Sequence, residues 1–184
     1  MSASQIPGYV SGTWTIDPAH SEIGFVVRHL MVSKVRGTFT KFEGTITTAE
    51  DPMASTGSAT IDLGSINTNN EQRDGHLRSA DFFDSDSHPE MSYKSTGLRK
   101  SGDGFIATGD LTIRGITHPV ELEVEVNGFG PDPYGGTRAG FTATGQINRS
   151  DFGVTWNAAI EGGGVVVSEK VQLVLEVEAV LDKA

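Results

Sequence analysis

Hydrophobic and polar residues alternate along most of this chain, which is the period-two pattern of β-strands with one buried face. The clearest case is Val120–Val126, where four aliphatic residues fall on one face and three glutamates on the other. Ile23–His29 keeps the same period. Similar spacing recurs at Phe39, Phe42–Ile46, Ile61–Leu63, Met91–Tyr93, Leu111–Ile113, Phe141–Ile147 and Val171–Val177. The chain is therefore predicted to be all-β.

Turn-forming residues separate these segments into about eight or nine predicted strands. The turn signals fall at Asp51–Pro52, Ser101–Gly104 and Pro131–Gly136. Strands with polar outer faces predict an antiparallel barrel of about eight strands, with a sandwich as the alternative. Lys170–Val180 is expected to pair with the N-terminal strand and close the sheet. No linker or repeat divides the chain, so residues 1–184 are predicted to form one domain.

The segment Ser65–Pro89 interrupts the strands with polar and aromatic residues and is much longer than a hairpin turn. A connection of this length usually has a function. Within it, Asn70–Ser79 predicts a short helix that Asn70 or its polar neighbours cap. The charged residues of the segment are expected to hydrogen-bond with one another, while Phe82 and Phe83 anchor it or guard an opening.

Glycine accounts for 23 of the 184 residues, about 12–13% against an average near 7%. Strand glycines mark bends or places where another group approaches closely. They could let long strands curl, or they could also keep the inside of a barrel open. An eight-stranded barrel is either filled by its own side chains or holds one slim ligand. Six glycines are assigned to predicted strands: Gly24, Gly37, Gly44, Gly109, Gly115 and Gly145.

The net charge of −10 argues against two classes of partner. Nucleic acids need a basic face, so no nucleic-acid partner is predicted, and an acidic protein is not attracted to an anionic membrane by its overall charge. No apolar run approaches the roughly 20 residues of a spanning helix, so direct membrane insertion is not expected. The chain has no cysteine, which excludes thiol chemistry and disulfides. The first ten residues lack the pattern of an export signal, which predicts a cytoplasmic protein.

Short blocks in order over nearly the whole chain resemble the YceI-like family. They are Trp14–Asp17 with His20–Ser21, Phe25–His29, Val35–Phe39, Ser65–Thr68, Arg73–Leu77, Asp81–Asp84, His88–Pro89, Gly109–Ile113 with Gly115, and Ile147–Gly153 with Trp156. The resemblance implies an extended, lipocalin-like barrel that binds a polyisoprenoid lipid, of the isoprenoid quinone or polyprenyl phosphate type, in its lumen. It implies carriage or storage rather than catalysis, and no cofactor is predicted.

A tube for such a lipid needs inward-facing apolar side chains and one polar end. The residues predicted to line it are Phe25, Val27, Phe39, Phe42, Phe82, Phe83, Ile113, Leu122, Phe141, Leu173 and Leu175. Arg73, His76 and Arg149 are the candidates for the polar end, because they can donate to a phosphate or a quinone carbonyl. Core packing is the alternative role of each apolar residue, and ion pairing with neighbouring carboxylates is the alternative role of the arginines.

Three other functions compete with lipid binding. Asp17, His20 and Ser21 are residue types of a hydrolase, but neighbours on a strand face opposite ways and no nucleophile motif is present. A metal site would need the fold to bring His20, His29 and His76 together, and none is predicted. An exposed strand edge or the Pro131–Gly136 loop could bind another protein or form a homodimer.

Overall fold

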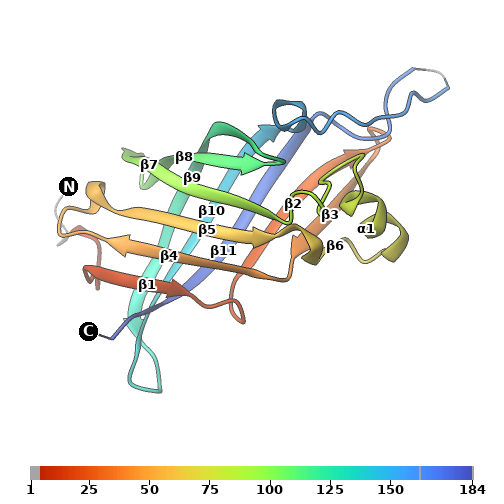
Figure 1. Ribbon diagram of the computed structural model, residues 1–184. Coiled ribbons are helices and arrows are strands. Elements are labelled where there is room, and N and C mark those ends of the chain that lie inside the picture. Colours follow the sequence, from red (N-terminus) through yellow and green to blue (C-terminus); the bar gives the residue numbers. More distant parts are fainter. Residues whose placement is uncertain (1–4, 162, 184) are drawn as a thin grey trace.

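The computed structural model describes residues 5–161 and 163–183, and these form an antiparallel barrel with a single short α-helix (Figure 1). The strands are β1 (Gly12–Ile16), β2 (Glu22–His29), β3 (Ser33–Phe39), β4 (Phe42–Thr48), β5 (Thr56–Asp62), β6 (Ile66–Asn67), β7 (Glu90–Ser101), β8 (Gly104–Ile113), β9 (Ile116–Pro131), β10 (Thr137–Asn148) and β11 (Lys170–Leu181). The helices are α1 (Glu71–Arg78) and the short 3-10 helices η2 (Pro52–Ala54), η3 (Leu63–Ser65) and η4 (Arg149–Phe152). The all-β prediction and the one predicted helix are confirmed.

The barrel closes because the long strand β11 pairs with two different strands along one edge. Its C-terminal half pairs with β1, in a register that places Trp14 opposite Leu181. This pairing closes a ring of eight strands in the order β1, β4, β5, β7, β8, β9, β10 and β11. Its N-terminal half pairs with β2, so β2, β3 and β6 extend the wall beyond the ring. The predicted pairing of the last strand with the first is confirmed.

The two ends of the barrel are built from different parts of the chain (Figure 1). Both termini and the turn between β9 and β10 lie toward one end. The other end, called the mouth below, consists of the β2–β3 tip (Leu30–Val32), α1 and the segment before β11 (residues 154–161 and 163–169). No described helix is long and apolar enough to cross a bilayer.

Two hydrophobic clusters pack inside the barrel. The larger contains the fully buried Leu63 and Phe152 and extends toward the mouth. The smaller surrounds the fully buried Trp14, whose indole Nε1 donates to Oγ1 of Thr48 at 2.8 Å. That bond satisfies the buried indole N–H, which would otherwise destabilise the fold.

Two strand glycines explain part of the high glycine content. A Cβ atom on Gly37 would lie 2.3 Å from Cζ of Phe25, and one on Gly109 would lie 2.3 Å from Cζ of Tyr93. At both positions an aromatic ring from a neighbouring strand occupies the space that a side chain would need. Gly115 was wrongly predicted to lie in a strand, because it occupies the β8–β9 turn with φ +73°. Gly37 and Gly109 therefore shape the inner wall by admitting aromatic rings.

Candidate ligand-binding cavity

An apolar cavity of about 330 Å³ lies inside the barrel on the side of the mouth. Because side chains of a strand alternate between its two faces, pairs such as Phe25 with Val27 and Leu173 with Leu175 point to the same side. Nine of the residues predicted for the tube line this cavity: Phe25, Val27, Phe39, Phe82, Phe83, Ile113, Leu122, Leu173 and Leu175. Phe39 forms a continuous aromatic wall with Phe25 and Phe83, with both pairs of ring centroids 5.9 Å apart.

A second apolar cavity, of about 210 Å³, continues along the interior toward the chain termini. Phe141, also predicted for the tube, lines this second cavity. Phe42 lines neither of the two; it stands opposite Ile61 at the start of β4 and packs against the larger hydrophobic cluster. The two cavities share four lining residues, Ala59, Tyr93, Leu122 and Leu175. These four residues form the partition between the two cavities.

Tyr93, in this partition, carries a buried hydroxyl that hydrogen-bonds to no described protein group. Burial, with a smaller contribution from the negative charge of Asp110, raises the pKa of Tyr93 to about 12. The phenol is therefore neutral at physiological pH and keeps its proton for donation. Since a buried polar group without a partner is costly, this hydroxyl identifies a position where a ligand's polar atom would be favoured.

The insert after β6 builds one side of the mouth around the buried carboxylate of Asp74. Thr68 donates to Oδ1 of Asp74 from its backbone N at 2.9 Å and from its hydroxyl at 2.5 Å. Arg73 in turn donates to the hydroxyl and the carbonyl oxygen of Thr68, both at 2.7 Å. The side chain of Asn70 caps α1 by accepting from the backbone N of Arg73 at 2.9 Å. Arg73 thus lines the cavity but already uses donors within the insert.

His76 connects α1 to the segment before β11. Its Nε2 lies 2.8 Å from a carboxylate oxygen of Asp81, and its ring meets those of Phe82 and Trp156 edge-on at 5.1 and 4.8 Å. The rings of Phe82 and Trp156 are themselves 5.3 Å apart. This trio of rings closes one side of the mouth over the cavity, which all three residues line.

Arg149 is buried, with 6% of its surface exposed, and it stabilises the segment before β11. It donates to the carbonyl oxygens of Val154, Trp156 and Ser168 at 2.8 to 3.0 Å. Burial lowers the pKa of its guanidinium, and the charge of Glu169 opposes that shift. The alternative role considered from the sequence was an ion pair with a neighbouring carboxylate, but no such pair forms among the described residues, and backbone carbonyls accept from Arg149 instead.

Several residues that line the cavity were missed as tube residues from the sequence. Trp156, Val154, Val166 and Val167 belong to the irregular segment before β11, where no period-two pattern marks an inward face. Tyr93 was recognised as part of a strand, but nothing in the sequence showed that its hydroxyl would be left without a partner. The apolar character of the valines was the only available signal.

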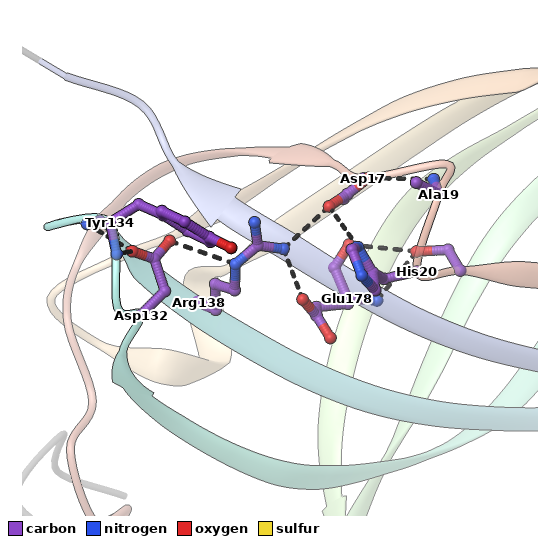
Figure 2. Close-up of polar contacts among 9 residues, drawn as sticks. Asp17, Ala19, His20, Asp132, Tyr134, Arg138 and Glu178 are labelled. Carbon is purple, nitrogen blue, oxygen red and sulfur yellow. Dashed lines mark hydrogen bonds and ion pairs between the residues drawn. The ribbon is translucent and has the colours of Figure 1, made fainter.

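Polar side chains gather around Arg138 away from the mouth (Figure 2). The guanidinium of Arg138 bridges Asp17 at 2.8 Å, Asp132 at 3.2 Å and Glu178, and His20 Nδ1 lies 2.8 Å from Oδ2 of Asp17, the same oxygen that Arg138 contacts. We call these five residues the Arg138 cluster. Arg138, followed by His20, lowers the pKa of Asp17 to about 2.

This cluster accounts for the residues of the hydrolase and metal hypotheses. Asp17, His20 and Glu178 are the one described group whose potential metal-ligating atoms lie together, within 4.8 Å, but both carboxylates already form ion pairs with Arg138. His29 and His76 lie apart from His20, on the wall of the cavity. The Ser21 hydroxyl donates to the backbone oxygen of Glu178 at 3.1 Å, so it does not form a pair with His20.

Comparisons with known proteins agree on one family. The YceI-like domain matches residues 14–179. Protein YceI of Escherichia coli is 41% identical over 165 residues, which are 89% of this chain and 83% of that protein. The crystal structure of the Campylobacter jejuni YCEI protein is 32% identical and superposes with a TM-score of 0.73 over 91% of this chain and 96% of that one.

A more distant structure shares the fold alone. The polyisoprenoid binding domain from Saccharophagus degradans is 16% identical and superposes with a TM-score of 0.69 over 94% of this chain and all of that domain. With a domain match across nearly the full barrel and relatives above 30% identity, the chain belongs to the YceI-like family.

Proposed function

We propose that this protein binds a long polyisoprenoid lipid, of the isoprenoid quinone or polyprenyl phosphate type, and carries or stores it without catalysing a reaction. The observation that supports this most is the pair of adjoining apolar cavities, about 330 and 210 Å³, inside a closed barrel. A slim, flexible and almost wholly apolar chain suits such an interior. The name of the Saccharophagus degradans domain, which shares the fold, is consistent with the same ligand class.

The energetics favour a ligand of several isoprene units. At about 0.8 kcal/mol per buried methylene, each five-carbon unit contributes roughly 3–4 kcal/mol. A handful of units would exceed the practical limit of non-covalent binding, near −18 to −21 kcal/mol. Part of the gain is therefore lost in ordering the flexible chain and the side chains that enclose it. A tail that spans both cavities would also need the Tyr93 partition to shift.

The polar group of the lipid has two candidate positions. Arg73, His76 and Arg149 line the cavity near the mouth, but each already bonds to protein groups. The Tyr93 hydroxyl, between the cavities, is buried and has no hydrogen-bond partner among the residues that the structure describes. We therefore infer that a carbonyl or hydroxyl oxygen of the ligand accepts from Tyr93, with the mouth residues as the alternative position.

Organic extraction of the freshly purified protein followed by mass spectrometry tests the proposed function. We expect a prenyl lipid at about one molecule per chain. Val27→Trp, which adds bulk to the cavity wall, should lower this yield, while Arg99→Met on the outer surface should not. Protein that contains no prenyl lipid and takes none up from a supplied isoprenoid quinone would contradict the proposal.

Tyr93→Phe tests the position of the polar group. The variant should bind an isoprenoid quinone roughly tenfold more weakly, as expected for a lost hydrogen bond of about 1.4 kcal/mol, and a prenyl hydrocarbon of equal length with unchanged affinity. If Tyr93→Phe leaves both affinities unchanged and Arg73→Met weakens the quinone instead, the polar group lies at the mouth. The cytoplasmic location and the homodimer remain predictions, which cell fractionation and mass measurement in solution would test.

A further inference from the structure

The tip between β2 and β3 exposes large apolar side chains to solvent. Val32 is 81% exposed and Met31 is 52% exposed. The tip is fixed to the segment before β11, since the backbone N of Leu30 donates to the oxygen of Val166 at 2.9 Å and His29 bridges to Val167. Val165 in that segment is also exposed, at 37%. Apolar groups that cluster on a surface in this way mark an interaction site.

The backbone of the tip adopts a strained left-handed conformation at its first two residues. Leu30 and Met31 have φ values of +51° and +59°, and the backbone N of Val32 donates to the oxygen of His29 across them. Positive φ at both central residues is typical of a type I′ turn, where Asn-Gly is strongly preferred. Bulky residues are rare in this conformation. Such strain at an exposed tip indicates a functional requirement for apolar residues there.

Basic residues surround the tip although the protein as a whole is strongly acidic. Arg28 on β2 stands directly opposite Lys34 on β3, and Arg36 follows on the same face. Like charges directly opposite each other destabilise a sheet, and none of the three makes an ion pair with a described residue. The chain from Ile23 to Phe42 contains no acidic residue.

The acidic residues closest to the tip in the neighbouring segment are Glu161 and Glu169. Glu169 is engaged by Ser150, which donates from both its backbone N and its hydroxyl. The tip therefore presents an apolar end and a basic margin that forms no ion pair within the described part of the chain, and this combination complements an anionic lipid surface.

The cavity lies directly behind this tip. Arg28, His29 and Val35 of the two strands line it, as do Val166 and Val167 of the segment bonded to the tip. Figure 1 shows the tip and that segment together at the end of the barrel opposite the two termini. A surface in contact with the tip would thus adjoin the part of the cavity wall that these residues form.

We propose that the β2–β3 tip docks on anionic lipid bilayers, with Met31 and Val32 in the interfacial layer and Arg28, Lys34 and Arg36 near the head groups. The purpose of this docking, exchange of cargo between the bilayer and the cavity, rests on the proposed function. The net charge of −10 does not prevent it, because charges more than about 8 Å away are screened at physiological ionic strength.

Vesicle flotation tests the docking. The protein should float with phosphatidylcholine vesicles that contain phosphatidylglycerol and only weakly with phosphatidylcholine alone. Replacing Met31 and Val32 together by serine should lower the partition coefficient on anionic vesicles roughly tenfold, because their apolar area is no longer buried. Lys34→Glu should cause a similar loss on anionic vesicles and none on neutral ones.

Two variants at the other end of the barrel are matched controls. Tyr134→Ser removes an apolar side chain that is 89% exposed in the β9–β10 turn, and Lys100→Glu reverses a charge at the β7–β8 turn. Both should float like the wild type. Equal flotation of the tip and control variants, or no flotation of the wild type on either vesicle, would overturn the proposal and leave a partner protein as the occupant of the tip.

A substitution that improves folding separates docking from misfolding. Leu30→Asn with Met31→Gly supplies the preferred turn residues, so the melting temperature should rise while flotation on anionic vesicles falls several-fold. Lipid extraction distinguishes failure of docking from failure of the proposed function. Protein with bound prenyl lipid but no flotation would be a carrier that does not dock by this tip. Flotation of protein without any prenyl lipid would support the docking proposal and contradict the proposed carrier function.

Discussion

The two ends of this barrel differ in how well their residues suit their local environment. In the Arg138 cluster every charge has a partner: one guanidinium bridges three carboxylates, and a histidine supports one of them (Figure 2). At the mouth, by contrast, Arg28 faces Lys34, Leu30 and Met31 adopt a backbone that suits Asn and Gly, and Val32 extends into water. The first arrangement stabilises the fold, whereas each feature of the second costs stability.

This difference separates structural roles from functional ones. Natural chains are locally consistent except where function requires otherwise. The Arg138 cluster has the residue types of a catalytic or metal site, yet its internal pairing explains them all. The β2–β3 tip contains no catalytic residue type, yet it breaks three local preferences within a few residues. The tip is thus the better guide to what the protein does at its surface.

Arg149→Met should have the largest effect, because it removes the support of the mouth itself. Loss of the guanidinium leaves the carbonyl oxygens of Val154, Trp156 and Ser168 without a donor, and the free energy of unfolding should fall by about 3 kcal/mol. Urea denaturation measures this. Arg99→Met is the control, since Arg99 pairs with Glu121 in the open, and it should change stability by less than about 1 kcal/mol. Equal effects would show that Arg149 does not support the segment.

Leu30→Asn combined with Met31→Gly should shift stability in the opposite direction. Each left-handed non-glycine residue costs roughly 1–2 kcal/mol, so relief of both should raise the free energy of unfolding by about 2 kcal/mol. The same denaturation series measures it. A loss of stability would mean that the side chains of Leu30 and Met31 contribute more to the fold than their backbone costs, and the contrast between the two ends would weaken.

Arg138→Met should reveal the stabilising role of the Arg138 cluster through its pH dependence. The pKa of Asp17 is about 2 in the folded protein and near 3.8 when unfolded, so its contribution is present above about pH 4 and is lost as the pH falls toward 2. We expect about 1 kcal/mol from Asp17, allowing for screening by solvent. The difference in unfolding free energy between wild type and Arg138→Met should therefore shrink between pH 4 and pH 2. A difference that is independent of pH would assign the effect to packing.

Lys34→Glu should have the smallest effect on stability. It turns the like-charge pair with Arg28 into an opposite pair, so the free energy of unfolding should rise by about 0.5 kcal/mol at low salt and by less at high salt. Thermal melts at two ionic strengths measure it. A decrease would show that Lys34 has a favourable partner in solution.

Periodicity in the sequence determined the strands, the barrel and most of the cavity wall. Val120–Val126 reveals its buried face without any other information, and Asn70 marks the start of α1 because capping is a local interaction. Nine of the eleven residues predicted for the tube line the larger cavity, since the inward face of a strand follows directly from period two.

Tertiary structure decided what depends on depth and on distant partners. Phe42 and Phe141 share the same period-two pattern, but the register of their strands places one in packed core and the other on the second cavity. Arg149 donates to carbonyl oxygens of an irregular segment, and no described group on the strands around Tyr93 accepts from or donates to its hydroxyl. Alternation along a strand determines which side chains face the interior. The depth of each side chain along the barrel, and whether its polar atoms find hydrogen-bond partners, are determined only when strands far apart in sequence pair.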